Sequence, residues 1–191
     1  MNVVAFNGSP RRDGNTYHSL KMVCDELDAR GIDTQIVQVG GNLLYGCLDC
    51  KECMRVHNNK CAIEKDKMND FIAAANAADG ILIGSPVYFG SMTTETKALI
   101  DRLGRITREN GFTLKNKPGA AVVTARRAGS NFTMAAINYL FTINQMPIVS
   151  STYWNFTMAY EKGEWQKDEE AARTLKTLGE NMAFMLGKLS K

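Results

Sequence analysis

The sequence predicts an α/β protein in which a parallel sheet is covered by helices on both faces. Two observations predict this fold: short apolar segments alternate with longer helical patterns along the chain, and the inner segments are apolar without a break. Ile81-Leu82-Ile83 and Ala120-Ala121-Val122-Val123 are such unbroken segments, as expected of strands buried on both sides. Right-handed crossovers between strands of this kind produce a three-layer, doubly wound fold.

The same periodicity predicts five strands and five helices. The strands are expected at residues 3–6, 32–39, 80–84, 120–125 and 148–153. The helices are expected at residues 16–30, 67–78, 94–108, 131–145 and 168–189. In the first helix Leu20, Val23, Cys24 and Leu27 share one face, and Gly31 follows as a suitable C-terminal residue.

Composition limits the domain count and the classes of partner. A chain of 191 residues, with 45% hydrophobic and 23% charged residues, fits one globular domain spanning 1–191. The net charge of +3 comes without a dense basic block and argues against a nucleic-acid partner. No apolar run is long enough to span a bilayer and the N-terminus has no signal-peptide pattern, so we expect no membrane association and a cytoplasmic location.

The segment after the first strand, Asn7-Gly8-Ser9-Pro10-Arg11-Arg12-Asp13-Gly14-Asn15-Thr16, opens directly into a helix. Unpaired N–H groups at a helix N-terminus and the helix dipole favour a phosphate, and two arginines add positive charge. The same composition is also found in ordinary strand-to-helix turns, in which Asn15 or Thr16 only caps the helix. From spacing alone both interpretations remain open.

Two further loops should meet the first at the carboxyl edge of the sheet, where doubly wound proteins bind ligands. Residues 85–94 carry Tyr88 and Phe89, whose rings either support a flat ligand or cap the core. Residues 126–130 follow the fourth strand. By contrast, residues 40–66 form a long insertion without clear periodicity, and long loops in compact domains are often functional.

The motifs resemble those of the NAD(P)H-dependent FMN reductases of the flavodoxin-like superfamily. The resemblance runs to about residue 147 and rests on Gly8-Ser9-Pro10-Arg11, Gly14-Asn15-Thr16, Gly84 to Gly90, Thr96-Lys97, Asp101-Arg102 and Arg126-Arg127-Ala128-Gly129. It implies a five-stranded parallel sheet of order 2-1-3-4-5. It also implies that the FMN phosphate is held by Ser9, Arg11, Asn15 and Thr16. The isoalloxazine would be lined by Pro86, Val87, Tyr88, Phe89 and Gly90. The remaining wall would consist of Arg126, Arg127, Gly129 and Ser130.

Four of the five cysteines lie within fifteen residues, as Cys47, Cys50, Cys53 and Cys61. Thiols at this spacing suit an iron–sulfur cluster or a tetrahedral zinc, although spacing leaves metal identity and free or disulfide-forming thiols open. The spacing, together with Tyr45-Gly46 and residues 65–68, resembles the iron–sulfur flavoproteins, a branch of the same superfamily. That resemblance implies a 4Fe-4S cluster near FMN. Cys24, on the apolar face of the first helix, is interpreted as a core residue.

These observations lead to two main hypotheses. In the first, FMN passes electrons from NAD(P)H to a quinone, a flavin or a similar small acceptor, which requires no side-chain base. In the second, a 4Fe-4S cluster relays single electrons from a ferredoxin-like donor to FMN. A zinc-stabilised or redox-sensing binding module is a third hypothesis. The resemblance implies a homodimer or homotetramer.

Overall fold

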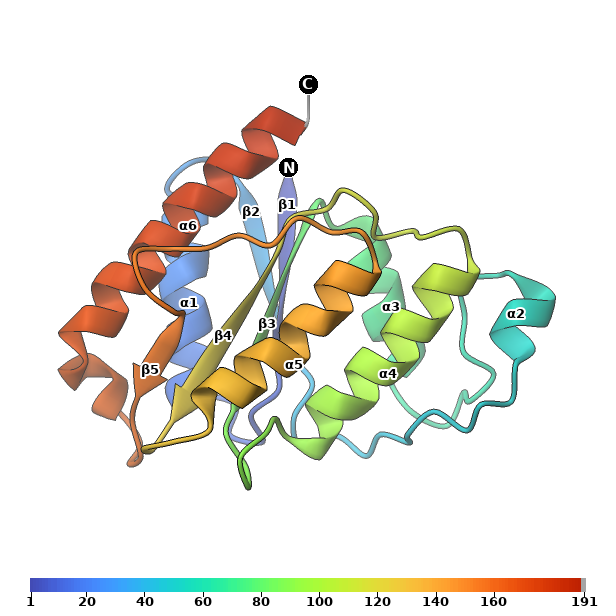
Figure 1. Ribbon diagram of the computed structural model, residues 1–191, viewed down its shortest axis with the longest axis horizontal. Coiled ribbons are helices and arrows are strands. Elements are labelled where there is room, and N and C mark those ends of the chain that lie inside the picture. Colours follow the sequence, from blue (N-terminus) through green and yellow to red (C-terminus); the bar gives the residue numbers. More distant parts are fainter. Residues whose placement is uncertain (190–191) are drawn as a thin grey trace.

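The computed structural model describes residues 1–189 and contains the predicted parallel sheet (Figure 1). Its strands lie in the order β2-β1-β3-β4-β5, which confirms the expected flavodoxin-like order 2-1-3-4-5. They are β1 (Asn2–Asn7), β2 (Asp33–Gln38), β3 (Gly80–Pro86), β4 (Gly119–Ala125) and β5 (Phe156–Met158). Residues 190 and 191 of the expected domain lie outside the described part of the chain.

Helices cover both faces of this sheet, which gives three layers (Figure 1). One face carries α1 (Asn15–Asp28) and α6 (Glu169–Leu189), which pack against each other. The other face carries α3 (Met68–Ala77), α4 (Thr94–Glu109) and α5 (Ser130–Ile143). Successive side chains of β1 point to opposite faces of the sheet and contribute to both apolar cores. Val4 and Phe6 belong to one core, and Val3 and Ala5 belong to the other. Of the described helices, none has the length and apolar character needed to cross a bilayer.

The fifth strand lies later in the chain than predicted. Near the predicted position only Ile148 forms a bridge, opposite Gly119, and β5 begins at Phe156. Between them the Asn155 side chain donates to the carbonyl of Ala121 at 3.0 Å, and Ser151 donates to Asn155 Oδ1 at 2.6 Å. Because the Asn155 side chain occupies the edge of β4, residues 150–154 leave the sheet before the strand resumes.

The insertion at 40–66 is largely irregular and runs along α4 to the far edge of the molecule (Figure 1). It contains one short helix that the periodicity did not predict, α2 (Glu52–Val56), which packs near α4. A second unpredicted element, the 3-10 helix η1 (Glu164–Lys167), follows β5. The carboxyl ends of β1, β3 and β4 meet at one edge of the sheet, as the parallel topology requires.

Candidate functional site

The loop from Gly8 to Asn15 is anchored to three other elements. The Gly8 N–H donates to the Gly84 carbonyl of β3 at 2.8 Å, and the Thr93 hydroxyl donates to the Gly8 carbonyl at 2.8 Å. From β2, the Gln38 side chain donates to the Ser9 carbonyl at 2.7 Å. These bonds fix the backbone of the loop, and no sequence motif indicated the roles of Thr93 and Gln38.

Gly40 forms the floor beneath this loop. A Cβ atom at this position would lie 2.3 Å from the Ser9 carbonyl carbon and 2.4 Å from the Gly8 carbonyl oxygen. Backbone atoms cannot yield at such distances, so residue 40 must be glycine for the loop to adopt this path. No sequence motif pointed to this residue.

The start of α1 is open to a ligand. Gly14 is the N-cap residue, no side chain among residues 1–189 caps the helix, and its first turn carries no acidic residue. The first N–H groups of a helix need an external partner, and with the dipole they attract an anion. Ser9, Arg11, Asn15 and Thr16 all line the cleft at this helix start. The structure therefore brings together the four residues predicted to hold a phosphate.

The Asn15 side chain itself has a different partner. Its amide donates to the Glu161 carbonyl at 2.9 Å, and its Oδ1 accepts the Gly163 N–H at 3.0 Å. Both polar ends of the amide are thus used to hold the segment after β5 against α1. Asn15 shapes the cleft through this segment, and its backbone N–H and the second N–H of its side-chain amide remain as donors for an anion.

The cleft has a volume of about 260 Å³ and is lined by three strand ends and the segment after β5. Pro86, Val87 and Tyr88 come from the end of β3 and the turn after it, Thr124 and Arg126 from the end of β4, and Ala159 and Tyr160 from the segment after β5. The guanidinium carbon of Arg126 lies 4.4 Å from the centre of the Tyr160 ring. This cation–π contact positions Arg126 along the cleft wall.

Five of the predicted flavin contacts are not part of the lining, namely Phe89, Gly90, Arg127, Gly129 and Ser130. Tyr88 and Ser91 bond to each other across a tight turn, in which Phe89 and Gly90 have φ of 48° and 81°. Positive φ at both central positions is typical of a type I′ turn, and it leaves the Phe89 side chain fully exposed at the tip. Gly129 lies behind the wall, where a Cβ would come within 2.7 Å of Val87 Cγ1.

Thr124 is a cleft residue that sequence reasoning missed. Its hydroxyl is buried and has no hydrogen-bond partner in the described part of the chain. An unpaired buried hydroxyl is costly and calls for a ligand or an ordered water. The available signal was its place near the end of a buried strand, in Val123-Thr124-Ala125. A cleft with an open helix start, a cation and a free hydroxyl fits the phosphate and polar chain of FMN.

The four clustered cysteines line a second, small cavity of about 20 Å³ together with Arg102 and Arg105 of α4. Cys47 and Cys50 are exposed, whereas Cys53 and Cys61 are partly buried. Among residues 1–189, no three side chains of the usual ligand types are close enough together to hold a metal ion. The donor set, four soft sulfur atoms beside two guanidinium groups, nevertheless suits an anionic thiolate–metal group.

The backbone of this segment is unusual. Asp49, Lys51, His57 and Asn59 have positive φ, between 49° and 62°. Non-glycine residues adopt this conformation only where their surroundings impose it, and such residues concentrate at functional sites. All four of these residues lie between Cys47 and Cys61, so within the insertion the unusual backbone is confined to the cysteine-bearing stretch.

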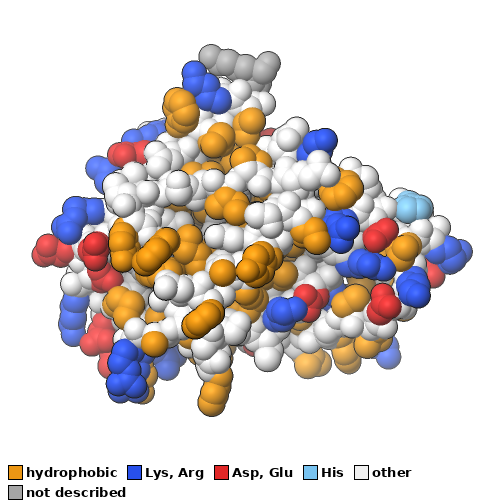
Figure 2. All heavy atoms as spheres, in the orientation of Figure 1, with side chains coloured by type: hydrophobic (Ala, Val, Ile, Leu, Met, Phe, Trp, Pro, Cys, Tyr) orange, Lys and Arg blue, Asp and Glu red, His pale blue; other side chains and the backbone are white. Residues whose placement is uncertain are grey.

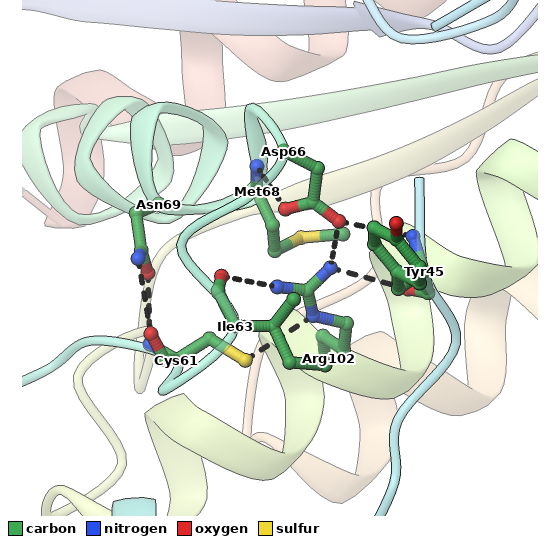
Figure 3. Close-up of polar contacts among 7 residues, drawn as sticks. All are labelled: Tyr45, Cys61, Ile63, Asp66, Met68, Asn69 and Arg102. Atoms are coloured by element: carbon green, nitrogen blue, oxygen red, sulfur yellow. Dashed lines mark hydrogen bonds and ion pairs between the residues drawn. The ribbon is translucent and has the colours of Figure 1, made fainter. Parts of the chain in front are cut away.

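A buried ion pair between Arg102 of α4 and Asp66 lies at the C-terminal end of the cysteine segment, residues 45–66 (Figure 3). Their N and O atoms are 2.5 Å apart and both side chains are fully buried. Burial works to raise the pKa of Asp66, but the hydrogen bonds from Arg102 and from the N–H groups of Tyr45 and Met68 outweigh it, so the pKa is lowered. The pair remains ionised in the interior.

The remaining cysteine differs from the clustered four. Cys24 lies on the buried face of α1, where burial raises the pKa of its thiol to about 12. A thiol with this pKa is almost entirely protonated near neutral pH, and a protonated thiol is a poor nucleophile and metal ligand. Its location in the core confirms the prediction made from its place on the first helix.

Comparison with known proteins identifies the family. Residues 1–161 match the model of the NADPH-dependent FMN reductase family. An iron–sulfur flavoprotein of Methanocaldococcus jannaschii is 30% identical over 198 residues, which cover 100% of both chains. Among solved structures, RosB with a bound 8-demethyl-8-formylriboflavin-5'-phosphate has a TM-score of 0.79 at 14% identity, covering 100% of this chain and 80% of its own. An archaeal flavodoxin has a TM-score of 0.63 at 13% identity, covering 98% and 99%. The chain therefore belongs to the NADPH-dependent FMN reductase family, among the iron–sulfur flavoproteins, and is a flavin-dependent oxidoreductase.

Proposed function

We propose that this protein binds FMN in the cleft at the carboxyl edge of its sheet and passes electrons from NAD(P)H to a small acceptor such as a quinone or another flavin. The observation that supports this proposal is the combination, in one cleft, of an open helix start, Arg11 and the partnerless Thr124 hydroxyl. When bound, FMN supplies the redox chemistry by accepting hydride from a nicotinamide.

In this proposal each wall of the cleft has one task. Ser9, Arg11, Thr16 and the first N–H groups of α1 hold the phosphate. Pro86, Val87 and Tyr88 support the flat ring system, and Arg126, from the neighbouring strand end, adds a positive charge beside it. The two turns that follow these lining residues contribute by holding them in place. They contain Phe89 and Gly90 after Tyr88, and Arg127, Gly129 and Ser130 after Arg126.

The protein's own contribution is binding and orientation. No side-chain acid or base is needed for hydride transfer to a flavin, so the cleft requires only fixed donors, a positive charge and one open side for the nicotinamide. The anchored loop from Gly8 to Asn15 meets the first requirement. Arg11 and Arg126 meet the second.

A second candidate function is electron relay, in which electrons arrive singly from a ferredoxin-like donor. In this function Cys47, Cys50, Cys53 and Cys61 would hold a 4Fe-4S cluster. The supporting observation is that all four thiols line one cavity beside two arginines. The name of the full-length relative from Methanocaldococcus jannaschii also supports it. Zinc at the same thiols belongs to the separate hypothesis of a zinc-stabilised binding module, because Zn²⁺ is not redox-active.

Anaerobic purification followed by visible spectroscopy and analysis of iron, acid-labile sulfide and zinc distinguishes these functions. FMN with rapid bleaching by NADH or NADPH, and without iron, supports the reductase. FMN with iron and sulfide, reduced by a ferredoxin but not by nicotinamides, supports the relay. Zinc without flavin would contradict both.

The phosphate assignment has a matched pair of charge reversals. Arg11→Glu places a negative charge in the cleft, whereas Arg12→Glu makes the same change one residue outside its lining. Removal of a charge-assisted hydrogen bond costs about 1.5 kcal/mol or more, so we expect FMN affinity to fall at least about tenfold only in Arg11→Glu. Riboflavin, which lacks the phosphate, should bind both variants and the wild type equally. Equal FMN affinities in the two variants would remove Arg11 from the phosphate site.

A further inference from the structure

We propose that Arg102 is a positioning residue for the four-cysteine site. Its side chain holds the Cys61 sulfur and both ends of the cysteine segment, residues 45–66. Its hydrogen bond to the sulfur also withdraws negative charge from that atom. The inference rests on the proposed function, in that the four thiols hold an iron–sulfur cluster or another metal. It assigns a role to a residue of α4 that is not itself a ligand.

The guanidinium group directs all three of its nitrogens at the cysteine segment (Figure 3). Nε donates to Cys61 Sγ at 3.3 Å, Nη1 donates to the Tyr45 carbonyl at 3.1 Å, and Nη2 donates to the Ile63 carbonyl at 3.1 Å. Arg102 is only 1% exposed, although it belongs to a helix that otherwise contributes apolar side chains to the core. Arginine suits this task because its donors form a rigid, planar fork.

Asp66 holds the fork in place and closes the segment from the other side. Besides its ion pair with Arg102, Asp66 accepts the N–H of Tyr45 at 2.9 Å and the N–H of Met68 at 3.1 Å. Tyr45 therefore uses both its N–H and its carbonyl in this network, at the position just before the first cysteines. The two ends of the cysteine segment are joined through one ion pair.

Cys61 is the best-fixed of the four thiols. Its N–H donates to Asn69 Oδ1 at 2.8 Å, and its carbonyl accepts the Asn69 side-chain amide at 3.0 Å (Figure 3). The sulfur is held by Arg102 as described. Cys47 and Cys50, by contrast, are exposed. Cys61 is thus the pre-set ligand against which the other three thiols close.

The hydrogen bond to sulfur has an electronic consequence as well as a geometric one. Donors to ligand sulfurs stabilise the more reduced, more negatively charged state of a bound cluster and raise its reduction potential. A buried ion pair whose only role were structural would need no donor on a thiol, and apolar residues often replace such pairs without loss. The bond from Nε to the Cys61 sulfur therefore favours a positioning role of Arg102 at the metal site over a purely structural ion pair.

The test compares the wild type with Arg102→Lys and with Arg108→Lys, a control on the same helix whose guanidinium stacks on Phe112. Lysine can still pair with Asp66 but cannot also reach the sulfur and two carbonyls. Each protein is loaded anaerobically with iron and sulfide, and the cluster potential is measured by a titration monitored by electron paramagnetic resonance. Arg102→Lys should shift the potential to lower values, whereas Arg108→Lys should leave it unchanged.

Hydrogen–deuterium exchange of the metal-free proteins supplies a readout that needs no cluster. Arg102→Lys removes the guanidinium bonds to the Tyr45 and Ile63 carbonyls, which hold the segment closed. Each such charge-assisted bond is worth about 1.5 kcal/mol or more, so exchange of the Tyr45 amide should accelerate at least about tenfold in Arg102→Lys alone. An unchanged potential together with unchanged exchange would overturn the role of Arg102.

Two results separate this inference from the proposed metal site. If Arg102→Lys does not fold, the wild type loaded with cadmium-113 is studied by NMR for scalar coupling between the Arg102 Nε–H and the metal through the Cys61 sulfur. Cadmium uptake without this coupling overturns the role of Arg102 and leaves the metal site intact. Failure of the wild type to take up iron, sulfide or cadmium overturns the metal site itself.

Discussion

The hydroxyl of Thr124 is buried near the end of β4 and has no partner among the described residues. On the adjacent strand, the hydroxyl of Thr157 is paired with Ser19 at 2.8 Å. The two threonines face each other across the β4–β5 ladder, yet only Thr124 lines the cleft. The Thr157 hydroxyl therefore stabilises the fold, whereas the Thr124 hydroxyl faces the cleft without a partner among the described residues.

Thr124→Val removes the hydroxyl and nearly preserves its shape. FMN affinity should fall by about 2- to 13-fold, because one hydrogen bond contributes about 0.5–1.5 kcal/mol, while the ligand-free protein keeps or gains stability. Fluorescence titration of FMN and thermal unfolding of the apoprotein measure the two effects. Thr157→Val, as the control, should lower the unfolding temperature and leave FMN affinity unchanged. A stability loss in Thr124→Val would mean that its hydroxyl has a partner in the fold.

Single residues also show where the sequence stops being informative. Ser9, Arg11 and Thr16 were correctly grouped, because a short loop between a strand and a helix places its residues at one spot. Asn15 was grouped with them and lines the same cleft, while its side-chain amide also binds the Glu161 carbonyl and the Gly163 N–H. These partners lie nearly 150 positions along the chain. A local motif contains no information on such distant partners.

Among the elements, the turn between β1 and α1 depends on the end of β2 more than on its own residues. Gln38 donates both to the Ser9 carbonyl and to the Gly40 carbonyl, at 2.7 and 2.6 Å. Its Oε1 accepts the side-chain amide of Asn7 at 2.8 Å. The loop is therefore part of a three-strand assembly rather than an independent motif.

Gly40→Ala tests this dependence. The new Cβ would meet the Ser9 and Gly8 backbone at 2.3 to 2.4 Å and push the loop off its path. We expect a loss of about 1–3 kcal/mol in the free energy of unfolding, typical of overpacking, and weaker FMN binding. Gly187→Ala, on α6 where no atom lies within 4 Å of the new Cβ, is the control and should be neutral or stabilising. Urea unfolding and FMN titration check both, and wild-type behaviour of Gly40→Ala would refute the close approach.

The segment after β5 carries its own pH sensor in Glu164. The N–H groups of Tyr160 and Glu161 donate to this carboxylate, and with Lys167 they lower its pKa from 4.5 to about 2. A carboxyl group with a lower pKa in the folded chain stabilises the fold above its unfolded pKa and loses that contribution as the pH falls toward the folded value. Hydrogen exchange of the Tyr160 and Glu161 amides, corrected for intrinsic rates, should be slow above about pH 4.5 and should accelerate as the pH falls below that value. Glu164→Gln should remove the pH dependence; an unaltered profile in this variant would assign it to another group.

The elements that periodicity misplaced lack an apolar alternation of their own. Residues 148–153 are apolar enough for a strand, but the Asn155 side chain, held by Ser151, bonds to the edge of β4, and the strand begins only at Phe156. The inner strands, β1, β3 and β4, were predicted to within two residues because burial on both faces dictates their composition. An edge strand of three residues has no such constraint.

At the scale of the whole molecule, apolar side chains gather on the outer face of α5 and on the segment that leads to β5 (Figure 2). On α5 they are Phe132, Tyr139 and Ile143, which are 75%, 70% and 52% exposed. Their spacing of seven and four residues places them on one stripe of the helix. Tyr153 and Trp154 add two exposed rings where the chain leaves the sheet. Exposed apolar patches of this kind mark association surfaces.

We predict that the homodimer or homotetramer expected from the family resemblance forms through this face. Ile143→Glu places a charge within the stripe without touching the cleft or the cysteines. Loss of a central interface residue costs about 2 kcal/mol or more, roughly a 30-fold weaker association, so sedimentation velocity at micromolar concentration should show a shift toward monomer. Phe184→Glu is the control, because Phe184 is 65% exposed on α6 in the opposite layer. The sedimenting mass of this variant should match that of the wild type. A monomeric wild type, or an Ile143→Glu variant with undiminished mass, would show that these rings serve another purpose.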